Sequence, residues 1–128
     1  MHRIALLAAA RKLKGKPYEE FPCGRLIQQI YKSIGIFLPS VSIHQALMGK
    51  EILKSSVLEE GDLLFFTGKK PQRGDLLFPG RNIHIGHVAM WMGEGKIVEA
   101  SSKKGRAVIR KISEKRLAKV LLIKRVLV

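Results

Sequence analysis

Cys23 is the single cysteine of the chain, and it lies where a nucleophile would be placed. It opens a helical run, residues 23–34, directly after Pro22, and proline just ahead of a helix is a common entry signal. A thiol at a helix N-terminus lies near free backbone N–H groups and the positive end of the helix dipole, which favour the reactive thiolate. The alternative is a structural cysteine, because lone cysteines are most often small buried hydrophobic residues.

A cysteine nucleophile requires a base and a group that orients the base. Of the four histidines, His87 stands out because it follows Gly86 and begins an apolar segment. Glu99 lies in the next apolar segment, and a carboxylate there needs a partner because an unpaired buried charge is costly. Taken alone, His87 is also explained as a satisfied core or edge histidine. His87 and Glu99, together with Cys23, predict a thiol hydrolase site.

The hairpin that carries His87 and Glu99 decides whether the two side chains meet. Segments 87–92 and 96–100 flank a glycine-rich stretch at 93–95, which is typical of a hairpin turn. A two-residue turn would put the two side chains on opposite faces, whereas a three-residue loop would make them diagonal neighbours on one face. The proposed pair therefore predicts the three-residue loop.

The elements that must position these residues come in a clear order, with helices first and antiparallel strands after. This order predicts an α+β fold with the helices packed on one face of an antiparallel sheet. The expected helices are 2–14, 23–34, 43–48 and a helical turn at 114–118, and the expected strands are 63–66, 87–92, 96–100, 107–112 and 120–128.

Two stretches are harder to assign. Residues 51–57 are expected to be irregular or a short strand. Residues 67–82 are rich in Gly, Pro, Lys and Arg and are expected to form a basic loop. Within that loop residues 74–78 repeat the five residues 61–65, so a second strand is the alternative, but Pro79 would cut it short.

Composition limits the class of protein. At 128 residues, with 46% hydrophobic and 27% charged residues, the chain is expected to be one domain, 1–128. A single cysteine excludes a disulfide framework and a cysteine-rich zinc site, and no metal or cofactor is expected. The 24 Lys and Arg against 10 Asp and Glu give a net charge of +14, which favours an anionic polymer as a partner. A solvated basic surface is the simpler explanation; nucleic acid stays open, although no nucleic-acid motif is present.

The N-terminus imitates a secretory signal, since a basic start precedes the apolar stretch 4–10. That stretch is only seven residues long and Arg11 follows at once, so an amphipathic helix is favoured. The expectation is a cytoplasmic protein if Met1 is the native start, or a cell-envelope protein if it is exported by another route.

The sequence resembles the NlpC family of papain-like cell-wall cysteine peptidases over nearly the whole chain. Several short motifs match in family order. They are Gly15–Tyr18, Cys23–Gln28, Gly35–Pro39, Ser42 with Gln45 and Gly49, Gly61–Phe66, Gly86–Gly93 and Gly95–Ser101.

The resemblance implies a papain-like core in which Cys23 is the nucleophile, His87 the general base and Glu99 the residue that orients the imidazole. It also implies that Tyr18 and Gly24 belong to the substrate and oxyanion site. The expected chemistry is hydrolysis of an amide in peptidoglycan stem peptides, often at γ-D-glutamyl bonds.

The chain departs from the family in ways that leave the substrate open. The family usually has Asp-Cys-Ser-Gly at the nucleophile, whereas this chain has Pro-Cys-Gly-Arg at 22–25, and the basic loop 67–82 is an insertion. Two alternatives therefore stand beside the peptidase. One is a non-catalytic module that binds an anionic polymer through its basic surface, and the other is an intracellular amidase or acyltransferase.

Overall fold

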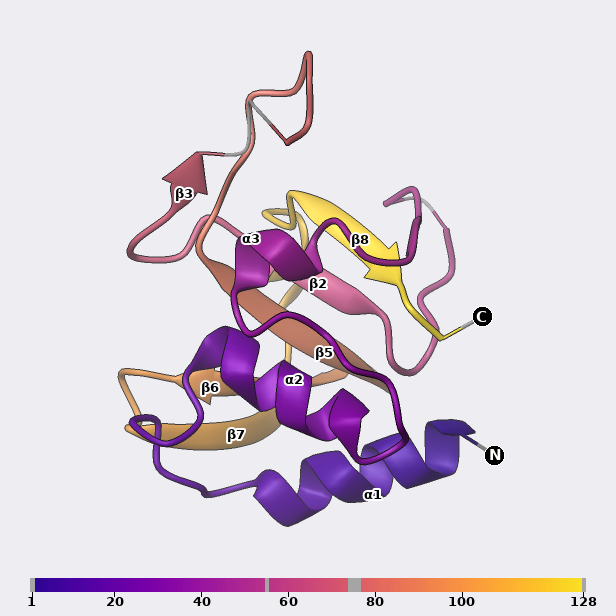
Figure 1. Cartoon of the computed structure of the whole chain (residues 1–128), viewed down its shortest axis with the longest axis vertical. Coiled ribbons are helices and arrows are strands. Elements are labelled where there is room, and N and C mark those ends of the chain that lie inside the picture. The colour runs from indigo at the N-terminus through magenta and orange to yellow at the C-terminus, as the bar shows by residue number, and fades with distance from the viewer. Residues whose placement is uncertain (1, 55, 74–76, 128) are drawn as a thin grey trace.

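A six-stranded antiparallel sheet forms the centre of the computed structural model, which describes residues 2–54, 56–73 and 77–127. The strands follow the order β1-β8-β2-β5-β6-β7, and both long helices lie on one side of them (Figure 1). This arrangement confirms the predicted α+β class. The strands are β1 Lys50–Glu51, β2 Leu63–Phe66, β5 His87–Gly93, β6 Lys96–Ser101, β7 Arg106–Lys111 and β8 Leu122–Arg125.

The helices agree with the sequence pattern except at their ends. They are α1 His2–Leu13, α2 Cys23–Lys32, α3 Ser42–Gln45 and α4 Glu114–Leu117. Helix α2 begins at Cys23 as predicted but ends at Lys32, two residues early. Gly35 follows it with φ 81°, a left-handed conformation that suits glycine, and the N–H of Ile36 returns to the carbonyl of Tyr31.

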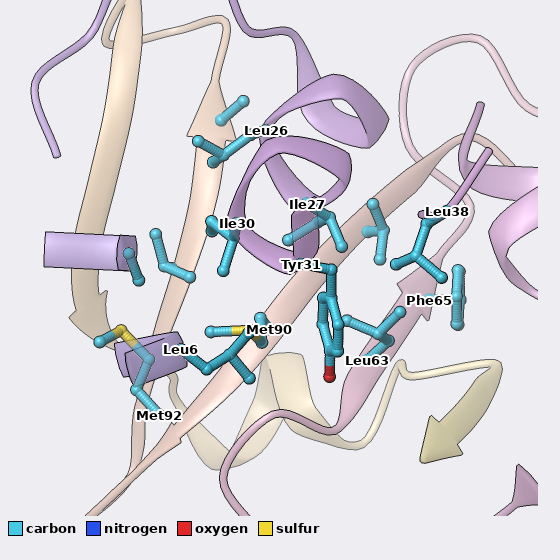
Figure 2. Close-up of a cluster of buried hydrophobic side chains, with 14 of the residues drawn as sticks. Leu6, Leu26, Ile27, Ile30, Tyr31, Leu38, Leu63, Phe65, Met90 and Met92 are labelled. Atoms are coloured by element: carbon cyan, nitrogen blue, oxygen red, sulfur yellow. The ribbon is translucent and has the colours of Figure 1, made fainter. Parts of the chain in front are cut away.

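Helix α2 is held to the sheet by its apolar stripe. Leu26, Ile27, Ile30 and Tyr31 recur at helical spacing and are fully buried against the sheet (Figure 2). Burying an aliphatic side chain of this size contributes about 1.5–3 kcal/mol. The Tyr31 hydroxyl also donates a 2.5 Å hydrogen bond to the carbonyl of Gly61, just before β2. The start of α2, which carries Cys23, is therefore rigidly placed over the sheet.

The sheet is covered on both faces. On the helix side it buries Phe65, Val88, Met90 and Val98, among others, and these belong to one core with α1 and α2. The opposite face, called the far face below, buries a second core of Ile52, Leu64, Phe66, Ala89, Ile97, Val120 and Ile123, with Leu117 of α4 packed on it. Burial on both faces explains why β2 is four consecutive apolar residues rather than an alternating pattern.

The turn of the β5–β6 hairpin differs from the prediction, but the strands pair in the predicted register. Gly93 pairs with Lys96, so the turn is a two-residue turn at Glu94 and Gly95, both with positive φ, and the three-residue loop is wrong. A bulge between Trp91 and Gly93 then shifts the pairing by one residue, which places Met90 opposite Val98. This is the register that the three-residue loop would have produced.

The segment predicted as a basic loop, 67–82, contains a short strand. Strand β3, Gln72–Arg73, pairs with β4, His84–Ile85, in a separate two-stranded sheet; β3 lies on a segment that projects from the body of the molecule (Figure 1), whereas Ile85 of β4 is buried in the helix-side core. The sequence missed this ribbon because two-residue strands carry no readable alternation. Residues 74–76 of the internal repeat lie outside the described residues.

The remaining differences are short strands at the expected places. Strand β1 occupies only Lys50–Glu51, where 51–57 was expected to be irregular or a short strand, and β8 covers only part of 120–128. Within the described residues, no helix is long and apolar enough to cross a membrane.

Candidate active site

Cys23 is the first residue of α2 and is partly buried. Pro22 precedes it in an extended conformation, and its carbonyl accepts the N–H of Arg25 at 2.7 Å and of Leu26 at 3.2 Å, which starts the helix. Among the described residues, no acceptor binds the backbone N–H of Cys23 or of Gly24. The thiol therefore lies beside two free N–H donors at the positive end of the helix.

Gly86 forms the corner against which the thiol lies. It joins β4 to β5, and the Cys23 thiol donates a 3.8 Å hydrogen bond to its carbonyl. A side chain at Gly86 would fall 2.5 Å from the carbonyl oxygen of Thr67 and 2.9 Å from that of Lys70. Only glycine lets the chain pass this point and bring the start of β5 to the start of α2.

His87 follows this corner and contacts Glu99 on the neighbouring strand. The His87 Nε2 and Glu99 Oε1 atoms are 2.6 Å apart, and Glu99 is 1% exposed. Burial lowers the pKa of His87, but its hydrogen-bonding interactions with the Cys23 thiol and with Glu99 outweigh burial and raise that pKa above its ordinary value. Because Nε2 is hydrogen-bonded to the carboxylate, Nδ1 is the ring nitrogen that remains for a hydrogen bond with the thiol. The three predicted residues are thus brought together.

Two arginines that the sequence analysis missed complete the surroundings of Glu99. Arg110 donates to Glu99 Oε2 from Nε at 3.0 Å and from Nη2 at 2.8 Å, and Arg116 donates to both carboxylate oxygens at 2.5 Å. Although burial opposes ionisation, the hydrogen bonds from Arg116 and His87 outweigh it and lower the pKa of Glu99.

A signal for one of these arginines was present. Arg110 pairs directly with Ile97, two residues before Glu99, so Arg110 and Glu99 share a face of the sheet. Once Glu99 is expected to be buried, an arginine at that diagonal position is the natural counter-charge. Arg116 has no such signal, because it reaches Glu99 from α4 rather than from a neighbouring strand.

The two remaining predicted site residues lie beside the nucleophile. The N–H of Tyr18 donates to the carbonyl of Gly105 at 2.9 Å, which ties its segment to the turn before β7. Burial raises the pKa of the Tyr18 phenol, and the charge of Cys23 raises it further, so the phenol lies within electrostatic reach of the thiol. A side chain at Gly24 would fall 2.3 Å from the carbonyl oxygen of Ser40, so close packing requires glycine there.

A cleft of about 350 Å³ opens beside the thiol. Its charged lining residues, Arg25 and Lys70, are both cations, and among the described residues no carboxylate lines it. The full lining is Pro22, Cys23, Gly24, Arg25, Ser40, Val41, Ser42, Lys70, Gln72, Ile85 and Gly86.

The arrangement has the parts of a thiol-dependent acyl transfer site. A thiol with free N–H donors beside it lines a cleft, and the thiol interacts with an imidazole of raised pKa that contacts a buried carboxylate. Within the described residues, no three His, Cys, Asp or Glu side chains are grouped so as to hold a metal ion. The catalytic roles of Cys23, His87, Glu99, Tyr18 and Gly24 stay predictions.

Comparison with solved structures gives the same fold. An NlpC/P60 family protein from Bacillus cereus superposes with a TM-score of 0.77 and 25% identity, over 98% of this chain and 40% of that one. The peptidoglycan hydrolase RipB from Mycobacterium tuberculosis gives 0.72 and 19%, over 98% and 65%. RipD from the same organism, described as a non-catalytic domain adapted to peptidoglycan binding, gives 0.71 and 18%, over 99% and 98%.

The chain spans about two fifths of the length of the Bacillus cereus protein. No curated protein sequence matches it. The sequence model of the NlpC/P60 family matches residues 12–72 and 67–126, which together include every predicted site residue. The chain therefore belongs to the NlpC/P60 family.

Proposed function

We propose that the chain is a cysteine hydrolase that cleaves amide bonds in peptidoglycan stem peptides. The observation that carries this proposal is the chain of contacts from the Cys23 thiol to the His87 imidazole and on to the buried Glu99 carboxylate, with Cys23 itself lining an open cleft. A structural role alone would not require a thiol and an imidazole to interact beside an open cleft. The peptidoglycan hydrolase RipB supports the choice of substrate.

The proposed reaction has two steps. The Cys23 thiolate attacks the amide carbonyl, and the His87 imidazolium gives its proton to the leaving amine, which leaves an acyl group on sulfur as a thioester. Neutral His87 then takes a proton from water, whose oxygen attacks the thioester and releases the acid. Glu99 keeps the imidazole ring oriented and stabilises its charged form through Nε2.

The negative oxygen that forms in each step needs donors. The free backbone N–H of Cys23 at the helix start is the first, and the Tyr18 hydroxyl is the candidate for the second. Gly24 contributes through its small size, because a side chain there would collide with Ser40 and change the wall of the cleft.

The cleft also favours one kind of substrate. With Arg25 and Lys70 as the charged residues among its described lining, it suits a peptide that presents a free carboxylate rather than an ammonium group. We therefore expect stem peptides with a free carboxylate beside the cleaved bond to react faster than their amidated forms.

A second function on the same fold is peptidoglycan binding without catalysis. RipD is such a protein, and the net charge of +14 and the replacement of the family's polar flanking residues by Pro22 and Gly24 favour it here. Binding and cleavage are separable by experiment.

The test is incubation of the purified chain with free-carboxylate and amidated muropeptides, followed by product mass measurement. The proposal requires an increase of one water per cleavage and no product from Cys23→Ala. Sedimentation with intact cell wall, without cleavage by either form, would instead support the binding function. Products that carry an added amine rather than water would identify an acyltransferase.

A further inference from the structure

Glu99 has more positive partners than a buried carboxylate needs. It accepts five hydrogen bonds, one from His87 and four from two arginines that reach it from different elements. Arg110 comes from β7 and Arg116 from α4. One guanidinium would balance the charge, so two leave a surplus of one positive charge around Glu99 even while His87 is neutral.

The hydrogen bonds divide the two oxygens of the carboxylate unequally. Oε1 lies 2.6 Å from His87 Nε2 and accepts one further hydrogen bond, from Arg116 Nη2. Oε2 accepts three hydrogen bonds, from Nε and Nη2 of Arg110 and from Nη1 of Arg116. Because Arg116 bridges both oxygens, it fixes the plane of the carboxylate. That plane decides where Oε1 lies relative to the imidazole.

Besides its hydrogen bonds to Glu99, Arg116 makes two further contacts that hold it in place. Its backbone N–H donates to the Ser113 hydroxyl at 3.1 Å, which caps α4, and its guanidinium carbon lies 4.7 Å from the centre of the Phe66 ring. The Phe66 ring centre is in turn 5.9 Å from that of His87. Arg116, Phe66, His87 and Glu99 therefore form a closed set of contacts on the far face of the sheet.

We propose that Arg116, supported by Arg110, is a positioning residue of the active site, which fixes Glu99 against His87 and offsets its negative charge. Glu99 then acts on His87 as an oriented hydrogen-bond acceptor more than as a full counter-charge. The effect of Arg116 on catalysis rests on the proposed function, whereas its effect on the protonation of the Cys23–His87 pair does not.

The charged and titratable groups around His87 come from five elements or segments. Glu99 and the Cys23 thiol contact it directly from β6 and α2, Arg110 and Arg116 act through Glu99, and Tyr18 acts through Cys23. Loss of a positive charge from this group disfavours every deprotonated form in it, the thiolate included. Removal of either arginine should therefore move the protonation steps of the thiol–imidazole pair to higher pH.

The test is the rate of alkylation of Cys23 by iodoacetamide between about pH 4 and pH 10 in the full chain, which has no other thiol. For Arg116→Gln we expect the steps of the rate profile to shift by about half a unit to one unit toward higher pH. Arg110→Gln should shift them less in the same direction, since Arg110 does not bridge the two oxygens. Arg116→Lys should restore most of the charge effect.

Arg125→Gln is the matched control, because Arg125 also clamps a buried carboxylate, Asp62, away from the thiol. Its profile should coincide with that of the unchanged chain. If Arg116→Gln does not fold, Arg110→Gln decides the question alone. Unshifted profiles in folded arginine variants would overturn the proposal, and so would an equal shift in Arg125→Gln. An unchanged chain with the profile of an ordinary free thiol would count against the proposed hydrolase instead.

Discussion

Two carboxylates of the sheet region, Asp62 and Glu99, are buried, and each is clamped by arginine. Asp62, just before β2, is 1% exposed and accepts two hydrogen bonds from Arg125, at 2.8 and 2.9 Å, and one from the N–H of Glu59. Glu99 is equally buried and accepts from Arg110 and Arg116. In burial and type of partner the two are alike.

They differ in what the remaining contact is. Asp62 completes its bonding with a backbone N–H, which cannot titrate, whereas Glu99 contacts the ring of His87. Glu99 also holds a second arginine that its charge does not require. A buried ion pair is weak evidence for function by itself, and the difference between the two is that one oxygen of Glu99 also faces a group that can change protonation.

Neutralising Glu99 should have the largest effect. Glu99→Gln removes the acceptor for two guanidinium groups and for His87, so we expect a loss of about 3–5 kcal/mol in the free energy of unfolding, as for other broken buried pairs. Amide cleavage should fall by about 100-fold or more because the imidazole loses its orienting partner. Denaturant titration and single-turnover product measurement test the two parts. Full activity in the folded variant would show that Glu99 resembles Asp62.

Neutralising Asp62 should cost stability alone. Asp62→Asn leaves Arg125 without its buried partner and should lower the free energy of unfolding by about 3 kcal/mol, measured by denaturant titration. The alkylation profile of Cys23 and the rate of cleavage should stay those of the unchanged chain at a temperature where the variant is folded. A shift in that profile would mean that the surroundings of Asp62 are coupled to those of Cys23, and the contrast would fail.

Acid should weaken the chain through Glu99. Its folded pKa lies below the unfolded value of about 4.3, so its contribution to stability is complete above that value and is lost as the pH falls through the folded pKa. The free energy of unfolding should therefore decrease between about pH 5 and pH 3. Glu99→Gln should lower that slope, and an identical slope would show that other carboxylates account for the acid sensitivity.

The smallest effect is expected at Arg125. Arg125→Lys keeps the charge beside Asp62 but loses the two-pronged contact, so we expect a loss of about 1 kcal/mol in stability. Thermal unfolding measures it. Arg125→Lys and Arg116→Lys both replace a planar guanidinium that makes two hydrogen bonds to a carboxylate. Any change in the reactivity of the Cys23 thiol is expected only in Arg116→Lys, so the pair separates the loss of stability from the effect on the thiol.

Much of this frame could be predicted from the sequence because it depends on local patterns. The start of α2 at Cys23 follows from the proline before it and the spacing of Leu26, Ile27 and Ile30, and β5 and β6 follow from their apolar runs. What could not be predicted depends on contacts between distant segments. Arg116 approaches Glu99 from a four-residue helix, and its position there is set by a cap and by packing on Phe66.

The hairpin shows the limit most clearly. The approach of His87 to Glu99 was predicted, but from the wrong turn, because a bulge changes register without leaving a mark in the residue pattern. The strand pair β3–β4 was missed for a similar reason, since two residues are too few to display a period.

The bulge between Trp91 and Gly93 sets which side chains of β6 face each side of the sheet, so the number of residues in this part of the hairpin matters. Surface turns usually accept insertions and deletions freely. Here the loss or gain of a single residue would exchange inward and outward positions along β6, so that Val98 or Ala100 would replace Glu99 beside the imidazole and the carboxylate would enter the helix-side core. Insertion or deletion of two residues would return Glu99 to the face that bears His87. The length of the turn at Glu94 and Gly95 thus sets which side chain of β6 faces the imidazole.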